Sequence, residues 1–248
     1  MMRRILLAAL GACTVLFAVA APAAAAPPPA ASQPSIIGGG DATETYSFMV
    51  SLDNGCGGSL VSPQWIVTAH HCGDASQGRV GSTDINSGGE LGDIDNVITK
   101  PGTDLTMMHL SQPVNAAPVP MAQDNPAAGT SARLLGWGCL SWPSCQTPST
   151  LQEIDLTVLD SGACAEGGGG AGDVCISGDQ AHSACHGDSG GPAVVGSPGN
   201  WTLVGETHGP GDNQGECATS TLYTGIAQHL SWINQQIGGG FLATAPIR

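Results

Sequence analysis

The chain has 248 residues and a formal net charge of -14, and only 6 of its residues are Lys or Arg. Nucleic acids and anionic membranes are therefore poor partners, because both carry negative charge. The length is sufficient for a sizeable core, and an all-β protein of this size can form one compact unit.

The N-terminus has the features of a secretory signal peptide. Two arginines precede an apolar run over residues 5–21, and small residues follow at 24–26. We therefore expect residues 1–26 to be a signal peptide and the protein to be secreted and extracellular. Residues 27–35 are Pro, Ala and Ser with one Gln, which predicts a short propeptide or linker. A membrane anchor is the weaker alternative, because no later segment is apolar enough to span a bilayer.

After this leader, short apolar runs alternate with Gly, Pro, Asn and Asp, a pattern typical of an antiparallel sandwich or barrel. A helix is predicted only near the C-terminus, where four apolar residues share one face and a glycine follows as the cap. These residues are Ile226, Leu230, Ile233, Ile237 and Gly238. Residues 238–248 are expected to be a flexible tail. The apolar runs cover 47–52, 59–68, 105–110, 132–137, 151–159, 192–196 and 201–207.

The cysteines point to disulfide bonds. Nine are present, and removal of Cys13 with the signal peptide leaves an even number in an exported chain. A metal site is the alternative, because His70, His71 and Cys72 are adjacent and two histidines lie four residues apart within 182–186. Thiols that could bind a metal would be oxidised outside the cell, so we expect neither a metal nor a cofactor.

Ser189 is a candidate nucleophile within the segment Gly187-Asp188-Ser189-Gly190-Gly191-Pro192. A serine hydroxyl needs a base to take its proton and donors to stabilise the oxyanion. The glycines allow the backbone to bend, so that the N–H groups of Gly187 and Ser189 can converge. A tight turn alone would fit the same pattern. Candidate partners nevertheless occur elsewhere, since an apolar run leads into His71 and Asp104 precedes another.

Taken together, these segments resemble the chymotrypsin-like, or trypsin-family, serine peptidases, in a secreted member of the bacterial type. The order His, Asp, Ser is that of the family, and it excludes an esterase in which the serine elbow comes first. The resemblance extends over nearly all of residues 36–237. It rests on Ile36-Ile37-Gly38-Gly39, Cys56-Gly57-Gly58-Ser59-Leu60, His71-Cys72, Asp104, Gly136-Trp137-Gly138, the Ser189 motif and Ser231-Trp232-Ile233.

The resemblance implies an all-β domain over 36–237, with two six-stranded antiparallel β-barrels, the active site between them and a C-terminal α-helix. It also implies a serine endopeptidase in which Ser189 attacks the substrate, His71 acts as base and then acid, and Asp104 orients the histidine. The N–H groups of Gly187 and Ser189 would form the oxyanion hole. His71 is preferred to His70 because it directly precedes Cys72. A catalytically silent relative that serves as a binding module is the alternative, which the complete triad disfavours.

The resemblance further implies a zymogen and a set of disulfides. Cleavage before Ile36 would release an α-ammonium group that pairs with Asp188, and the pair would shape the oxyanion hole. The family pattern suggests the pairs Cys56–Cys72, Cys164–Cys175 and Cys185–Cys217, which leaves Cys139 and Cys145 to close a small loop. Other pairings remain possible from the sequence.

The substrate pocket departs from the pattern of relatives that cleave after Lys or Arg. Ser183 stands where those relatives carry an aspartate at the pocket floor, and a buried cation without a partner would be costly. Thr221 would narrow the pocket beside Gly209, which predicts small or medium uncharged P1 residues. His208 could instead bind a Glu side chain or be a wall residue. We expect protein or peptide substrates, protein protease inhibitors as partners, no nucleic acid or membrane, and a monomer.

Overall fold

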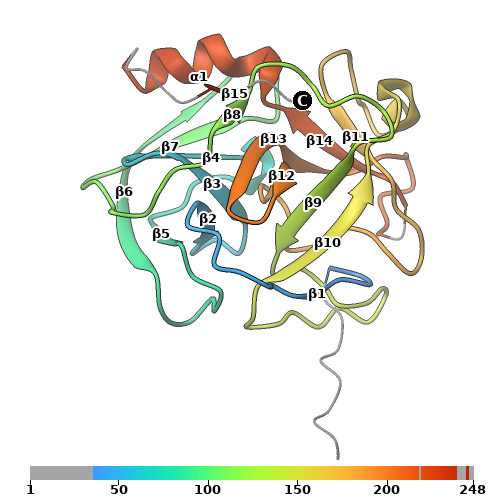
Figure 1. The fold of residues 1–248 in the computed structure, drawn as a ribbon, viewed down its shortest axis with the longest axis horizontal. Helices are drawn as coiled ribbons and strands as arrows, with labels where there is room; N and C mark the ends of the chain where they lie inside the picture. The colour runs from blue at the N-terminus through green and yellow to red at the C-terminus, as the bar shows by residue number, and fades with distance from the viewer. Residues whose placement is uncertain (1–35, 218, 239–243, 246–248) are drawn as a thin grey trace, which may run out of the picture. The chain divides into compact units, whose positions relative to one another are not determined.

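The computed structural model describes residues 36–217, 219–238 and 244–245, so the expected signal peptide and propeptide lie outside the described residues. Six of its strands close into a first barrel in the order β2-β3-β4-β7-β6-β5 (Figure 1). Every pairing in this barrel is antiparallel, as expected. The strands are β2 (Met49–Leu52), β3 (Gly57–Ser62), β4 (Trp65–Thr68), β5 (Gln77–Val80), β6 (Glu90–Thr99) and β7 (Thr106–Leu110).

The first barrel has an apolar interior built from the runs that the sequence displays. β2, β3 and β7 consist mainly of buried residues, and Ile66 and Val67 of β4 are fully buried. β-branched residues pack well on a pleated surface, which favours strands here. The predicted run 59–68 becomes two strands, because Pro63 and Gln64 form the turn between β3 and β4. β5 and the acidic β6 were not predicted, since neither is a continuous apolar run.

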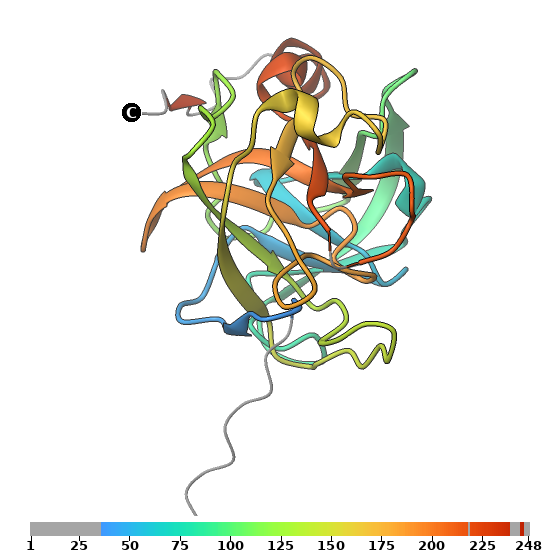
Figure 2. The same cartoon turned by 90° about the vertical axis from the view of Figure 1, so that its right-hand side faces the viewer.

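A second sheet of nine strands contains the path β1-β10-β9-β12-β13-β14-β11, with β8 and β15 at its side (Figures 1 and 2). The expected second barrel is open along this path. β11 has only three residues, and the ladder between it and the end of β10 is reduced to the bridge Val158–Ile176. The strands are β1 (Gly40–Asp41), β8 (Met121–Ala122), β9 (Ser131–Gly136), β10 (Gln152–Thr157), β11 (Val174–Ile176), β12 (Pro192–Ser197), β13 (Asn200–Pro210), β14 (Thr221–Gly225) and β15 (Thr244–Ala245).

The C-terminal helix forms where the apolar periodicity places it. A 3-10 turn, η3 (Ala227–His229), leads into α1 (Leu230–Gln236), which ends at Gly238 with a positive φ of 88°. Ile233 is fully buried, and the other helix positions of the apolar face pack on the same core. Within the tail, Thr244–Ala245 pairs with β8. Among the described residues, no helix combines the length and apolar character needed to cross a membrane.

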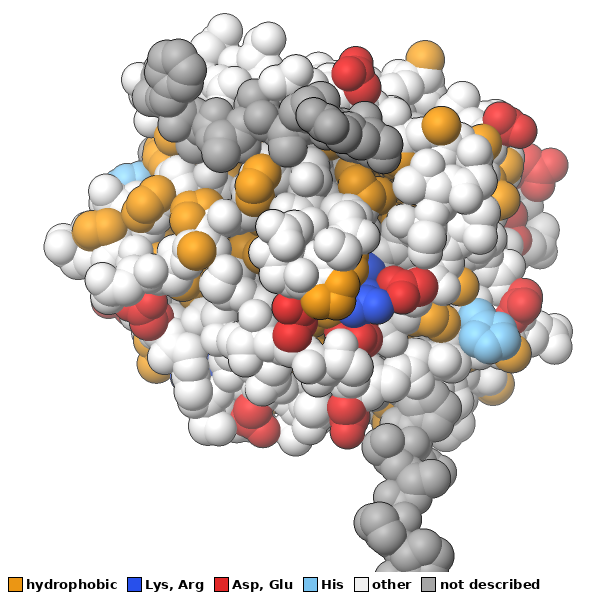
Figure 3. Space-filling view, viewed as in Figure 1, with side chains coloured by type: hydrophobic (Ala, Val, Ile, Leu, Met, Phe, Trp, Pro, Cys, Tyr) orange, Lys and Arg blue, Asp and Glu red, His pale blue; other side chains and the backbone are white. Residues whose placement is uncertain are grey.

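The described surface carries much more negative than positive charge. Figure 3 shows acidic side chains at several places on one face and little basic surface. Arg133 forms salt bridges with Glu153 and Asp155 at 3.1 and 2.6 Å, and its guanidinium lies 4.9 Å from the centre of the Trp201 ring. This cation is therefore engaged in a local network, and it is not free to attract anionic partners.

Candidate active site

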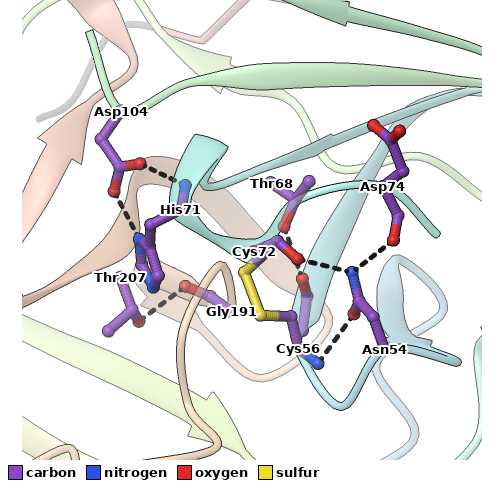
Figure 4. The surroundings of a disulfide bond; sticks show 10 residues. Asn54, Cys56, Thr68, His71, Cys72, Asp74, Asp104, Gly191 and Thr207 are labelled. Carbon is purple, nitrogen blue, oxygen red and sulfur yellow. Dashed lines mark hydrogen bonds and ion pairs between the residues drawn. A yellow bond between two sulfur atoms is a disulfide. The ribbon is translucent and has the colours of Figure 1, made fainter.

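Strand register brings His71 and Asp104 together. β4 pairs with β7 so that Thr68, at the end of β4, lies opposite Thr106, at the start of β7. His71 follows β4 in the 3-10 turn η1 (His70–Cys72), and Asp104 lies just before β7. Residues that follow one strand therefore meet residues that precede its antiparallel neighbour, as Figure 4 shows for this pair.

Asp104 holds His71 through two contacts. Oδ2 lies 2.8 Å from His71 Nδ1, and Oδ1 accepts a 2.7 Å hydrogen bond from the His71 backbone N–H (Figure 4). Burial alone would raise the pKa of Asp104, but the hydrogen bonds from His71 hold that pKa below its usual range. The carboxylate is therefore charged and fixed in orientation, and it orients the imidazole. His70 is exposed and is not hydrogen-bonded to Asp104, as the choice of His71 requires.

The loop that carries Ser189 is attached to both sheets. Gly57 of β3 donates its N–H to the Ser189 carbonyl at 2.8 Å, and Gly190 donates to the Thr207 carbonyl at 2.9 Å. Ser189 and His71 line the same cavity, although no hydrogen bond joins their side chains. The serine thus lies at the junction of the first barrel and the second sheet, facing the cavity from the loop before β12.

Two backbone N–H groups beside the nucleophile are unoccupied. Among the described residues, neither the N–H of Gly187 nor that of Ser189 has a hydrogen-bond partner. Gly187 has a φ of 93°, a conformation that residues with a Cβ rarely adopt. Ser189 lines the cavity that His71 also lines, and Gly187 lines a neighbouring hollow with Gly55 and Cys56. Unpaired backbone donors beside a nucleophile can bind a developing oxyanion.

Asp188 is buried without a cation. Its carboxylate accepts hydrogen bonds from the backbone N–H groups of Gly138, at 2.8 Å, and Cys185, at 2.9 Å. Desolvation raises the pKa of Asp188 to about 7, against the opposing effect of these two donors. A Cβ on Gly138 would lie 2.4 Å from the Asp188 carboxyl carbon, so this position must be glycine. Ile36 is fully buried, and its neighbour Ile37 accepts a 3.0 Å hydrogen bond from the Ser183 N–H.

The substrate cavity has a volume of about 250 Å³ and only part of the expected lining. His208, Gly209 and Thr221 line it, whereas Ser183 is fully buried and is not among the lining residues. Sequence reasoning missed several lining residues, because no recognisable motif includes them. These are His186, Pro210 at the end of β13, Glu216, Thr219 and Ser220.

The sequence also did not show how two residues of β13 are used. His208 Nε2 lies 3.7 Å from Asp104 Oδ2, so this histidine approaches the carboxylate that orients His71. Glu206 is fully buried, and neither carboxyl oxygen has a hydrogen-bond partner within the described part of the chain. Desolvation raises the pKa of Glu206 well above its usual range, and the nearby Ser59 hydroxyl offsets this only in part. Regular alternation would place Glu206 and His208 on the same face of β13. The register against β14 shifts between Thr207 and Gly209, and this irregularity separates the buried Glu206 from His208 at the site.

All four expected disulfides are present. Cys56–Cys72 ties η1 to the start of β3, and Cys185–Cys217 joins the segment before Ser189 to a loop that lines the cavity. The other two bonds are Cys139–Cys145 and Cys164–Cys175. The part of the chain that the structure describes contains no group of three or more His, Cys, Asp or Glu side chains arranged to hold a metal ion.

Comparison with known proteins identifies the family. The trypsin family model matches residues 36–233. This chain belongs to the trypsin family. A trypsin from Sarcophaga bullata is 34% identical over 68% of this chain and 76% of its own length, and trypsin alpha from Drosophila melanogaster is 33% identical over 79% and 85%. A tryptase from Mus musculus is 28% identical over 75% of this chain and 80% of its own length.

The trypsin-family protein is a serine endopeptidase with a mostly β fold. These relatives come from flies and mouse, so they lend no support to the expected bacterial type. The matched residues include both the His71–Asp104 pair and the Ser189 loop. The family therefore accounts for the fold and the class of reaction, while the roles of individual residues follow from the site geometry.

Proposed function

We propose that this trypsin-family peptidase cleaves peptide bonds through an acyl-enzyme formed on Ser189. The observation that carries the proposal is the 2.8 Å contact between His71 Nδ1 and Asp104 Oδ2, beside a cavity that Ser189 also lines. With Nδ1 held by the carboxylate, Nε2 is the ring nitrogen left to exchange a proton with the serine. This division of roles is the one that acyl transfer needs.

In this mechanism Ser189 Oγ attacks the scissile carbonyl as His71 removes its proton. The carbonyl oxygen becomes an oxyanion, which accepts hydrogen bonds from the N–H groups of Gly187 and Ser189. His71 then donates the proton to the leaving amine, and water hydrolyses the acyl-enzyme by the reverse sequence of proton transfers. Asp104 keeps the histidine in the required tautomer throughout.

Active-site titration with a serine-directed phosphonylating reagent tests the nucleophile. We expect the protein that begins at Ile36 to be labelled once and to lose its peptidase activity in step. The Ser189→Ala variant should be neither labelled nor active. Ser131→Ala removes an exposed serine at the start of β9 and serves as the matched control, which should be labelled like the wild type. Equal labelling of wild type and Ser189→Ala would contradict the assignment.

Activation by cleavage before Ile36 is part of the proposal. Asp188 is buried with only backbone N–H donors, and the α-ammonium of a new N-terminus at Ile36 would supply the missing positive charge. Because Asp188 lies between Gly187 and Ser189, this ion pair would order both oxyanion donors. Extending the mature chain by one residue before Ile36 should strongly reduce turnover of a peptide anilide, and unchanged turnover would contradict the mechanism.

We further propose a preference for small or medium uncharged P1 residues. Thr221 contributes a branched side chain to a cavity of about 250 Å³, and no Lys or Arg of the described residues lines this cavity. A preference for Glu has weaker support, since His208 Nε2 lies 3.7 Å from a carboxylate of the protein itself.

Peptide anilides that differ only in the P1 residue test the preference. We expect the highest kcat/KM with Ala or Val, and fastest cleavage after Lys or Arg would refute the pocket assignment. Thr221→Gly should raise the kcat/KM ratio of Leu to Ala about tenfold, because the variant adds space for a larger side chain. Thr202→Gly removes a threonine from β13 outside the cavity and should leave this ratio unchanged.

The proposal also assigns roles to the N-terminal residues, to the C-terminal tail and to the binding partners. Residues 1–26 would direct secretion, and 27–35 would keep the chain inactive until cleavage before Ile36. The tail from 238 would have no part in catalysis. Substrates would be extracellular proteins or peptides, and proteins that occupy the cavity would be inhibitors.

A further inference from the structure

A second histidine approaches the carboxylate that orients His71. His208 Nε2 lies 3.7 Å from Asp104 Oδ2, and the same oxygen is 2.8 Å from His71 Nδ1. The two imidazole rings are stacked, with centroids 6.3 Å apart and an angle of 26° between their planes. A distance of 3.7 Å is an ion-pair contact and is too long for a hydrogen bond. One carboxylate oxygen is thus shared by two imidazoles.

Oδ2 is the Asp104 oxygen that His208 contacts, because the other two oxygens of Asp104 already accept hydrogen bonds. Oδ1 already accepts the His71 backbone N–H at 2.7 Å, and the Thr224 hydroxyl donates to the Asp104 carbonyl at 3.2 Å. The Asp104 side chain is only 10% exposed, whereas that of His208 is 38% exposed and accessible to protons. A charge on His208 therefore acts on a carboxylate that water screens poorly.

Other titratable groups face the same region from neighbouring elements. A groove beside His208 is lined by His70 of η1, by Asp173 before β11 and by His229 of η3. Desolvation lowers the pKa of His229, and nearby Lys100 lowers it further. Among the histidines around this point, His71 and His208 are the two that pair with Asp104.

We propose that His208 is a positioning residue for the triad, which holds the Asp104 carboxylate beside His71. This inference rests on the triad proposed above. The His208 ring stacks on that of His71 and its Nε2 faces Asp104 Oδ2, so the ring restricts the orientations open to the carboxylate. The carboxylate in turn orients the His71 imidazole.

The test compares His208→Gln and His208→Ala with the wild type, using the pH dependence of kcat and KM. Gln keeps an amide donor near the position of Nε2 but cannot take a proton. We expect it to retain kcat within about threefold at alkaline pH, whereas Ala should lose about tenfold, as is typical when a supporting contact is removed. KM should be nearly unchanged in both variants, because the ring acts on Asp104 and does not hold the substrate.

His109→Gln is the matched control. His109 Nδ1 lies 2.6 Å from Asp95 Oδ1 on the first barrel, so the variant removes a similar histidine–aspartate contact outside the active site. Its kcat should match that of the wild type. A wild-type kcat in His208→Ala would overturn the proposal. A change in KM alone would also overturn it, because it would assign His208 to substrate binding.

A second measurement separates this inference from the proposed triad. In the inactive Ser189→Ala background, proton NMR at one pH can follow the proton between His71 Nδ1 and Asp104 Oδ2 with and without His208. We expect its signal to be retained in His208→Gln and broadened in His208→Ala, and identical signals in the three proteins would refute the inference. Full activity of Ser189→Ala would instead refute the triad itself, so the two failures are distinguishable.

Discussion

The first barrel and the second sheet position their active-site residues in different ways. His71 and Asp104 come from the first barrel, where strand register and two direct hydrogen bonds hold them and the pKa of Asp104 is lowered. Ser189 comes from the second sheet, next to a buried carboxylate whose pKa is raised to about 7. The first arrangement is complete within its own barrel. In the proposed activation the second gains a positive charge from the new N-terminus at Ile36, which would make it the part of the site that is switched.

The comparison predicts that the largest loss of activity follows from a change in the second sheet. In the chain that begins at Ile36, Asp188→Asn should lower kcat/KM by roughly a hundred- to ten-thousandfold, because it removes one partner of a buried ion pair. Asp95→Asn on the first barrel removes an exposed carboxylate and should leave kcat/KM nearly unchanged. Kinetics with one peptide anilide compare both variants. A decrease in kcat/KM of less than tenfold for Asp188→Asn would contradict the proposed activation through this carboxylate.

The second prediction concerns stability and pH. Burial raises the pKa of Asp188 from its ordinary value of 3.8 to about 7 in the folded chain, so its charge opposes folding. Its effect is absent below the unfolded pKa, grows as the pH rises and is complete above pH 7. In the full chain the free energy of unfolding should therefore fall by on the order of 4 kcal/mol between pH 4 and 7 from this group.

A new ammonium group at Ile36 should abolish this loss by pairing with Asp188. Urea unfolding of the Ser189→Ala protein, with and without residues 1–35, measures the difference and avoids self-digestion. Parallel pH profiles for the two chains would contradict the pairing, because Glu206 is present in both chains and contributes equally to each.

The third prediction, with the smallest expected effect, compares how two glutamates contribute to stability. Burial raises the pKa of Glu206 in the second sheet, so its contribution to stability decreases as the pH rises above the unfolded value. Hydrogen bonds from Asn115 lower the pKa of Glu90 in the first barrel, so its contribution is present at neutral pH and is lost as the pH falls.

Glu206→Gln should therefore stabilise the protein at pH 8 by about 1–3 kcal/mol and flatten its pH profile. Glu90→Gln should have the opposite sign and a smaller effect. Urea unfolding at pH 5 and 8 measures both. A loss of stability at pH 8 in Glu206→Gln would show that the buried acid is stabilising.

Much of the fold could be predicted because its signals are local. The apolar runs of β2, β4, β7, β9, β10, β12 and β13 lie within predicted segments, and the helix ends at Gly238 as expected. β6 was not predicted, because Asp and Asn interrupt its apolar residues. The strand forms through its pairing with β5 and β7. The opening of the second barrel also depends on pairing, since β11 is too short to form a ladder with β10.

The candidate site likewise has features that the sequence predicts and features that only the tertiary structure shows. By itself the sequence determined the residue types and their order: His71, Asp104 and Ser189 in separate motifs, glycines beside the nucleophile, and an even set of cysteines in the exported chain. Only the tertiary structure decided which oxygen of Asp104 lies near two imidazoles, that Ser183 is fully buried, and that the Glu206 carboxylate has no hydrogen-bond partner among the described residues. The reason is physical. A motif shows which side chains are neighbours along the chain. The desolvation of a carboxylate, and the contact of one carboxylate with two imidazoles, depend on segments that meet only when the chain folds.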